Sequence, residues 1–302
     1  MPCGRLTYTN PPLDISSQID LLKERGLSIP NPERASRYLK FIGFHRLSTY
    51  CLPFQHSADP EHHFKDKTEF EYVLDLYIFD RKLRAIAMDA IGRIEIALRT
   101  VINERMSLQH GTQWYTDPLH FKRKKHGFDH AQFIEIVKKE TGYSNSQGGS
   151  PSCRNYYAKY CHPVLPPSWM VAEVLSLGTW SRIYSSLSDP EDRKFISNEF
   201  HIRHGLFGSW IHAISHTRNI CAHHSLLWNH VFTITPQLKY EFTGLDNKKF
   251  HAQALVLYQF LKGISGESRW KSRLLDHVMT CPLPYQAAMG FPQDWMDGSY
   301  WQ

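Results

Sequence analysis

Residues 79–110 read FDRKLRAIAMDAIGRIEIALRTVINERMSLQH, a long stretch with a regular apolar pattern. Apolar side chains recur there at alternating spacings of four and three, at Leu83, Ala87, Ala90, Ile94, Ala97 and Val101. Such spacing places the side chains on one face of an α-helix. The stretch therefore predicts a long helix that buries this face in a protein core.

Other segments also carry helix signals, and strand signals are scarce. Asn31-Pro32 is typical of a helix start and predicts a helix through Arg46, and Asp189-Pro190 opens another helix in the same way. Further helices are expected near 129–140, 169–187, 206–228 and 248–264. The large aromatic side chains expected in the core are Trp169, Trp180 and Trp210. The sequence predicts an all-α fold.

The chain is expected to fall into three regions. Residues 1–60 form a small N-terminal helical segment, residues 61–280 the main helical domain, and residues 281–302 a C-terminal tail. Within the main domain, the polar and glycine-rich residues 142–154 predict a mobile loop.

The composition is that of a globular protein with a mild basic excess. Hydrophobic residues make up 42% of the 302 residues, and the formal net charge is +6. A basic excess favours a polyanionic partner such as nucleic acid without requiring one. The six cysteines form no Cys-x-x-Cys pair, and no apolar run approaches the roughly 20 residues that span a bilayer. The N-terminus lacks an apolar signal core, so a cytoplasmic location without membrane association is expected.

A basic run precedes the glycine-rich loop and lies near several tyrosines. Its members are Lys122, Arg123, Lys124 and Lys125. Basic residues close to aromatic rings can hold single-stranded nucleic acid through phosphate contacts and base stacking, which makes the run a candidate RNA-binding segment. A solvated loop flanked by ordinary surface is the alternative interpretation.

The most informative stretch is residues 212–224, HAISHTRNICAHH. On a helix, His212, His216, Asn219 and His223 fall on one face that carries only polar groups. A face directed into the core should be apolar, so this face is expected to line a cleft or a subunit interface.

Arg218 and His223 are the candidate catalytic pair. Histidine exchanges protons near neutral pH, and the arginine fork stabilises the charge that develops on a phosphate. Together they suit metal-independent RNA cleavage by the ribose 2′-OH. Five-residue spacing separates the two side chains by about 140° on a straight helix. They converge only if the helix bends or ends between them, or if two copies of the chain meet.

Several neighbouring features have simpler interpretations. A second Arg-x4-His pair, Arg105 and His110, is read as coincidence or helix-end capping. His212, His216 and His224 could supply part of a zinc site, but no carboxylate or cysteine is placed to complete it, so no metal and no cofactor are expected. Glu95 and Arg99 form a salt bridge by spacing, or with Arg93 they support the site from the long helix.

The stretch Arg218–Asn229 (RNICAHHSLLWN) resembles the signature of the Abi-like family of abortive-infection proteins, AbiD and AbiF, within the HEPN superfamily. Further stretches that resemble the family are residues 18–27, 38–50, 79–84, 93–99 and 289–295. The resemblance implies an α-helical HEPN bundle that pairs with a second copy, with Arg218 and His223 as catalytic residues and Asn219 as a supporting polar residue. The HEPN part is also similar to RNA-guided, RNA-cleaving CRISPR effectors.

From these features we expect a toxic endoribonuclease of a phage-defence system. His223 acts as general acid and base, Arg218 stabilises the phosphate, and His216 and His224 lie nearby in support. Expected partners are an RNA substrate, a regulatory non-coding RNA and a second copy of the chain. A catalytically silent HEPN module that binds RNA or a protein, as a sensor or antitoxin-like component, is the alternative. A metal-dependent hydrolase built on the histidines is a third interpretation.

Overall fold

The computed structural model describes residues 11–122, 127–143, 148–242, 244–266, 268–293, 295 and 301. These residues form α-helices and short 3-10 helices and contain no β-strand, which confirms the predicted all-α fold. The chain divides into two compact units, Met1–Lys82 and Leu83–Gln302. The division falls within the long helix α4 (Phe70–His110).

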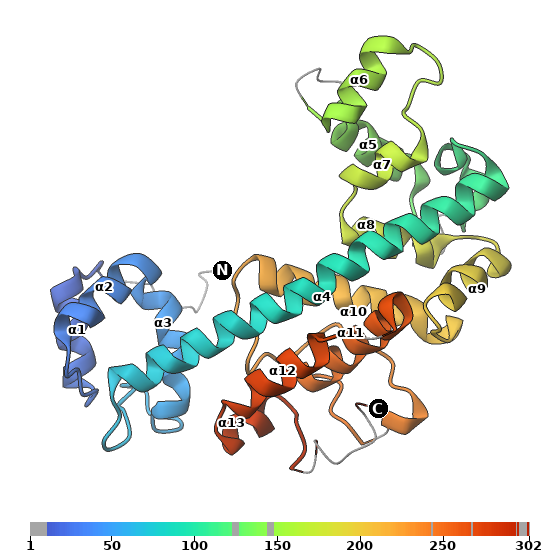
Figure 1. Ribbon diagram of the computed structural model, residues 1–302. Helices are drawn as coiled ribbons and strands as arrows, with labels where there is room; N and C mark the ends of the chain where they lie inside the picture. The colour runs from blue at the N-terminus through green and yellow to red at the C-terminus, as the bar shows by residue number, and fades with distance from the viewer. Residues whose placement is uncertain are drawn as a thin grey trace, which may run out of the picture. The chain divides into compact units, whose positions relative to one another are not determined.

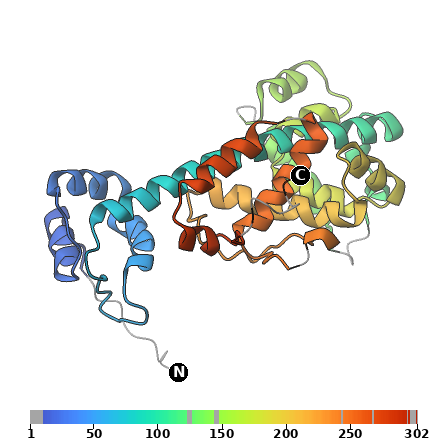
Figure 2. The ribbon, with the colours of Figure 1, turned by 60° about the horizontal axis from the view of Figure 1, so that its bottom comes forward.

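The first unit contains α1 (Ile15–Glu24), α2 (Pro32–Ile42), α3 (Phe44–Cys51), the 3-10 helix η1 (Leu52–Phe54) and the start of α4. In Figures 1 and 2 the three short helices gather beside this first part of α4. Asn31 caps α2 as expected, because its side chain accepts a hydrogen bond from the Arg34 amide at 2.9 Å. The predicted helix through Arg46 is wrong in one respect: Gly43, at φ 92°, ends α2 and separates it from α3.

The long helix α4 buries a face that differs in part from the predicted one. Leu83, Ala87, Ala90 and Ile94 are fully buried as expected, whereas Ala97 and Val101 are only half-buried. Leu98, Ile102 and Met106 take the core positions instead. Each spacing of four turns the buried face about 40° around the helix. The buried face rotates because the neighbours of α4 change along its length. Near Ile86 the neighbour is Trp270, which donates to the Ile86 carbonyl at 2.7 Å, and near Arg105 it is Asp192 of α9.

The second unit is organised around α10 (His204–Ala222), which packs most extensively against α8 (Leu177–Ser186) and also against α9 (Pro190–Glu199) and α11 (Phe250–Ser265). Figure 1 shows α10 and α11 side by side, with α12 (Trp270–Met279) and α13 (Leu283–Ala288) following. Aromatic rings fill the space between the helices, with Phe207 5.2 Å from Phe260 and Trp210 fully buried. The core of this unit therefore holds α10 in place.

The remaining helices of the second unit are α5 (His130–Thr141), α6 (Pro151–Lys159) and α7 (Ser168–Val174), with the 3-10 helices η2 (Trp114–Thr116), η3 (Pro118–His120) and η5 (Tyr240–Phe242). The predicted loop at 142–154 is too long, because Ser150 caps α6 and the helix begins at Pro151. The predicted helix at 169–187 is two helices, since Ser176 caps α8. Trp180 and Trp210 are buried as expected, but Trp169 is 47% exposed on α7.

Candidate functional site

The candidate catalytic residues lie where α10 ends. The helix stops at Ala222, six residues before the end of the predicted helix at 206–228, which is therefore wrong at its C-terminus. His223 is the C-cap, and the Ser225 amide donates to the Ile220 carbonyl at 3.0 Å while the His224 amide donates to the Cys221 carbonyl at 3.1 Å. This is a Schellman motif, which returns the chain at the end of a helix.

The backbone of this helix end carries strain. His224 adopts φ 54°, a left-handed conformation that costs a residue with a side chain about 1 kcal/mol. His223 has φ −84° and ψ 6°, the sparsely occupied region between helix and strand in which many active-site residues lie. The helix runs unbroken from Arg218 to Ala222, and the His223 amide still donates to the Asn219 carbonyl at 3.0 Å, so the five-residue spacing still separates the two side chains around the helix.

The side chains around this helix end are open to solvent. Arg218 is half-buried, Asn219 and His223 are exposed, and Nη1 of Arg218 lies 3.4 Å from Oδ1 of Asn219, which accepts its hydrogen bond. Within the described ranges, no carboxylate lies within ion-pair distance of Arg218 or His223. The guanidinium and the imidazole are therefore available to an external anion.

The predicted polar face of α10 does not point into the core. His212, Asn219 and His223 are exposed and His216 is half-buried. The His216 ring lies 6.2 Å from the rings of His230 and Phe232. Burial lowers the pKa of His216 below 6.5, and the neighbouring His212 lowers it further. His216 is consequently neutral at pH 7. His224 is exposed and directly follows His223, the candidate general base.

Arg84 is a residue of this region that sequence reasoning did not single out. Its side chain is buried, and its Nη1 donates to the Ser225 carbonyl at 3.2 Å. Three residues further on, Trp228 is buried and its Nε1 donates to the Tyr285 carbonyl at 3.2 Å. The segment after His223 is thus fixed on both sides. The sequence did hold a signal for a buried role of Arg84, because this arginine directly follows Leu83 within the apolar part of the predicted helix.

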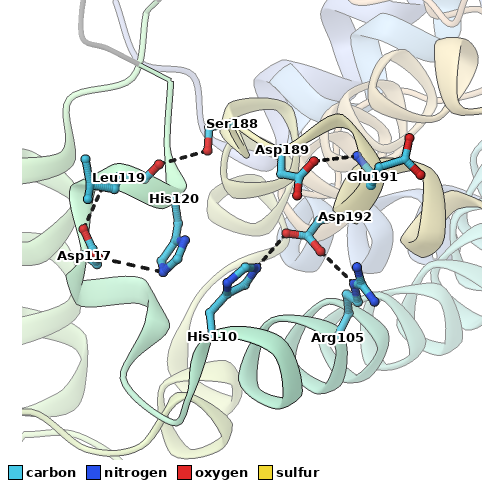
Figure 3. A network of polar contacts seen from close by, with 9 residues as sticks. All are labelled: Arg105, His110, Asp117, Leu119, His120, Ser188, Asp189, Glu191 and Asp192. Atoms are coloured by element: carbon cyan, nitrogen blue, oxygen red, sulfur yellow. Dashed lines mark hydrogen bonds and ion pairs between the residues drawn. The ribbon is translucent and has the colours of Figure 1, made fainter.

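The second Arg-x4-His pair has a different environment, shown in Figure 3. Nε of Arg105 donates to Oδ1 of Asp192 at 2.7 Å, and Nε2 of His110 lies 2.8 Å from the other oxygen, Oδ2. Asp192 belongs to α9 and is 2% exposed. Both side chains bind one buried carboxylate rather than the carbonyl groups at the helix end, and the interpretation of the motif match as coincidence stays a prediction. The ring of His120 lies 4.3 Å from that of His110.

The proposed supporting residues on α4 make contacts of their own. Arg93 donates to Ser265, the last residue of α11, at 3.0 Å, and to Ser268, between α11 and α12, at 3.1 Å. Glu95 and Arg99 form the close ion pair that their spacing predicts. A role of these three residues in positioning Arg218 stays a prediction.

Only the first residue of the basic run lies in the described part of the chain. Nζ of Lys122 donates to the Ser185 carbonyl at 2.7 Å. Burial lowers the pKa of Lys122, and the nearby Arg193 lowers it further. Lys122 is therefore engaged by the protein itself, while Arg123, Lys124 and Lys125 lie outside the described residues.

Metal-binding clusters and membrane-spanning helices are both absent from the described residues. No three His, Cys, Asp or Glu side chains lie together there as a metal site requires. No helix in those residues has both the length and the apolarity needed to cross a bilayer. The five described cysteines are free thiols.

Comparison with known proteins gives one match, to a family model. No curated protein and no solved structure matches the chain. The model describes Abi-like proteins and matches residues 37–229, a range that includes four of the resembling stretches, 38–50, 79–84, 93–99 and 218–229. The stretches at 18–27 and 289–295 lie outside it. Because the match covers more than half of the chain and includes the end of α10, the chain belongs to the Abi-like protein family.

Proposed function

We propose that the chain is a metal-independent endoribonuclease of HEPN type that acts in abortive infection. Membership of the Abi-like family suggests the phage-defence role. The observation that carries the catalytic assignment is the contrast between two Arg-x4-His pairs. Arg105 and His110 are both bound to the buried Asp192, whereas Arg218 and His223 lie at an exposed, strained helix end without a carboxylate among the described residues.

The proposed reaction uses the RNA as its own nucleophile. His223 takes the proton from a ribose 2′-OH, whose oxygen attacks the adjacent phosphorus while the bond to the 5′-oxygen breaks. A proton is returned to that 5′-oxygen, so the products are a 2′,3′-cyclic phosphate and a 5′-hydroxyl. Arg218 stabilises the negative charge on the phosphorane oxygens. Asn219 orients Arg218 through their mutual hydrogen bond.

The active form proposed here is a homodimer, with RNA as substrate and a regulatory non-coding RNA as a further partner. Because α10 runs unbroken from Arg218 to Ala222, the two side chains leave the helix in different directions, and a second copy would supply the group on the opposite side of the phosphate. A further support is the exposed polar face of His212, Asn219 and His223, which suits a wet interface. A mixture of His223→Ala and Arg218→Ala proteins should recover part of the activity if the groups combine across the dimer. Light scattering measures the oligomeric state at each concentration at which activity is assayed. A protein that is monomeric and fully active at all concentrations would exclude the dimer.

One experiment tests the cleavage. Purified full-length protein is incubated with end-labelled single-stranded RNA, and with DNA of the same sequence, in the presence of EDTA. We expect RNA alone to be cut, with cyclic phosphate ends, and we expect His223→Ala and Arg218→Ala each to abolish cutting. His204→Ala is the matched control, because His204 is an exposed histidine at the start of the same helix.

The other interpretations are outcomes of the same experiment. RNA binding without cleavage by the wild-type protein would favour the silent binding module. Cleavage that is lost in EDTA and restored by zinc would favour the metal-dependent hydrolase. Wild-type cleavage by either the His223→Ala or the Arg218→Ala variant would remove the catalytic assignment.

A further inference from the structure

A cavity of about 910 Å³ lies within the first unit, far along the sequence from Arg218 and His223. Its walls come from α2 and from residues 77–81 of α4. On α2, Arg34, Arg37, Tyr38 and Phe41 follow one another at helical spacing and line the cavity, while Ala35 and Leu39 point into the core. One face of α2 is thus buried, and another is directed at the cavity.

Arginines dominate the charge of the cavity. Arg34 and Arg37 on α2 and Arg81 on α4 are all exposed, and Glu33 is the acidic side chain among the lining residues. In the described parts of the chain, none of the three guanidinium groups forms an ion pair with a carboxylate. A planar guanidinium without a carboxylate partner can bind phosphate oxygens through two parallel hydrogen bonds.

Aromatic rings lie between these charges. The Tyr38 ring centre is 5.8 Å from the Arg34 guanidinium carbon, a cation–π contact. Phe41 is 76% exposed, and the ammonium of Lys40 lies 5.7 Å from its ring centre. Large apolar rings are unfavourable in water, so an exposed phenylalanine among cations marks a candidate contact surface.

The ring on the opposite wall is held firmly. Tyr77 of α4 meets the ring of Tyr50 edge-on, with the centres 5.4 Å apart and the planes at 89°. Tyr50 is itself buried and donates its hydroxyl hydrogen to Asp80 at 2.6 Å. A ring that is fixed from behind can accept a flat partner without losing side-chain freedom, which lowers the entropic cost of binding.

We propose that this cavity binds single-stranded RNA, with bases stacked on Phe41, Tyr38 and Tyr77 and phosphates held by Arg34, Arg37 and Arg81. Alternating cations and aromatic rings are the two features by which proteins hold single strands without reading the sequence. Duplex RNA hides its base faces and cannot use the rings. The choice of RNA as the nucleic acid rests on the proposed function, but the binding itself requires neither Arg218 nor His223. The cavity would recruit the strand that the helix end cleaves.

The test measures binding by the full-length His223→Ala protein, so that cleavage does not interfere. The probe is a fluorescently labelled single strand of about 12 nucleotides. Phe41→Ala should raise Kd about tenfold without changing its salt dependence, because it removes a stacking platform. Arg34→Gln combined with Arg37→Gln should lower the slope of log K against log salt by about 1.4, because two phosphate contacts are lost.

The controls have matched chemistry at exposed positions of the second unit. Arg182→Gln combined with Arg203→Gln removes two exposed arginines, and Trp169→Ala removes an exposed aromatic ring. Both controls should bind as the parent protein does. Circular dichroism of each variant verifies that it is folded, which surface positions should allow.

Three outcomes would overturn the proposal. The first is cavity variants that bind like the controls, the second is duplex RNA binding as tightly as the single strand, and the third is a mononucleotide competing as well as the strand. The proposed cleavage is judged separately, in the wild-type protein. If the wild-type protein cleaves RNA but the cavity variants bind like the controls, the cavity proposal alone is wrong. If binding depends on the cavity but the wild-type protein does not cleave RNA, the ribonuclease proposal alone is wrong.

Discussion

The buried guanidinium of Arg84 donates a hydrogen bond to the carbonyl of Ser225, two residues beyond His223, at 3.2 Å. A buried charge is tolerated only where polar partners surround it. Arg84 therefore fixes the backbone that follows the candidate general base. It acts through Ser225 and is a positioning residue in the proposed reaction.

We expect Arg84→Lys to impair cleavage without removing RNA binding. A lysine keeps the charge but has a single donor group in place of the planar fork, so the chain after His223 should shift. A misplaced catalytic group costs roughly ten- to a hundredfold in rate. The measurement is a split of kcat from KM: kcat should fall while KM changes little. Lys82→Ala, at an exposed position of α4, is the control. Unchanged kcat in Arg84→Lys would contradict the positioning role.

Two histidines share an uncommon backbone conformation, and they form a matched pair. His201 follows α9 and His224 follows α10, each at φ 54° and each within the paired hydrogen bonds of a Schellman motif. Glycine adopts this conformation without steric cost. His201→Gly should therefore raise the free energy of unfolding by about 1 kcal/mol and leave cleavage unchanged.

His224→Gly relieves the same backbone strain but removes an imidazole beside His223. If the ring supports catalysis, this variant should lose cleavage without losing the fold, in contrast to His201→Gly. Urea unfolding and the RNA cleavage assay, performed on both variants together, provide the comparison. Wild-type cleavage by His224→Gly would show that the ring has no part in the reaction.

The end of α10 shows why the sequence could indicate candidate residues but not their structural setting. After Ala222 come two histidines, a serine, two leucines and a tryptophan, with no glycine, asparagine or proline to stop the helix. The stop depends on tertiary contacts, since Leu227 and Trp228 are buried and Ser225 binds Arg84. By contrast, the helix start at Asn31-Pro32 is a local signal, and it was predicted correctly.

Long-range pairs were also beyond the sequence pattern. Asp192 lies 87 residues from Arg105 and 82 from His110 along the chain, so their shared contact has no local signature. The buried face of α4 was predicted correctly as far as Ile94. Beyond Ile94 the elements that pack against α4 change, so a fixed alternation of three and four residues no longer predicts which side chains are buried.

Asp192→Asn should destabilise the second unit strongly. The substitution keeps the size of the side chain but leaves Arg105 without its buried counter-charge, and Nε2 of His110 loses a charged acceptor. Breaking such a pair typically costs about 3 kcal/mol. Urea unfolding measures the loss. Glu191→Gln, at an exposed position next to Asp192 on α9, should leave the free energy of unfolding unchanged within about 0.5 kcal/mol. Equal stability of the two variants would contradict the importance of the Arg105–Asp192–His110 network.

His251 should make the stability of the protein depend on pH. Its ring is buried against Phe291, with the centres 4.4 Å apart, and burial lowers its pKa from 6.5 to about 4. Above pH 6.5 the ring is neutral in both the folded and the unfolded chain. As the pH falls from about 6.5 to about 4, the unfolded chain takes up a proton that the folded chain does not. Stability should therefore decrease in this window, by roughly 1.4 kcal/mol per pH unit from this group.

The measurement compares the free energy of unfolding of the wild type and of His251→Leu at several pH values. The leucine variant should be less stable at pH 8 because the cavity is filled differently, but its stability should fall less steeply below pH 6.5. Parallel curves for the two proteins would show that His251 does not carry the dependence.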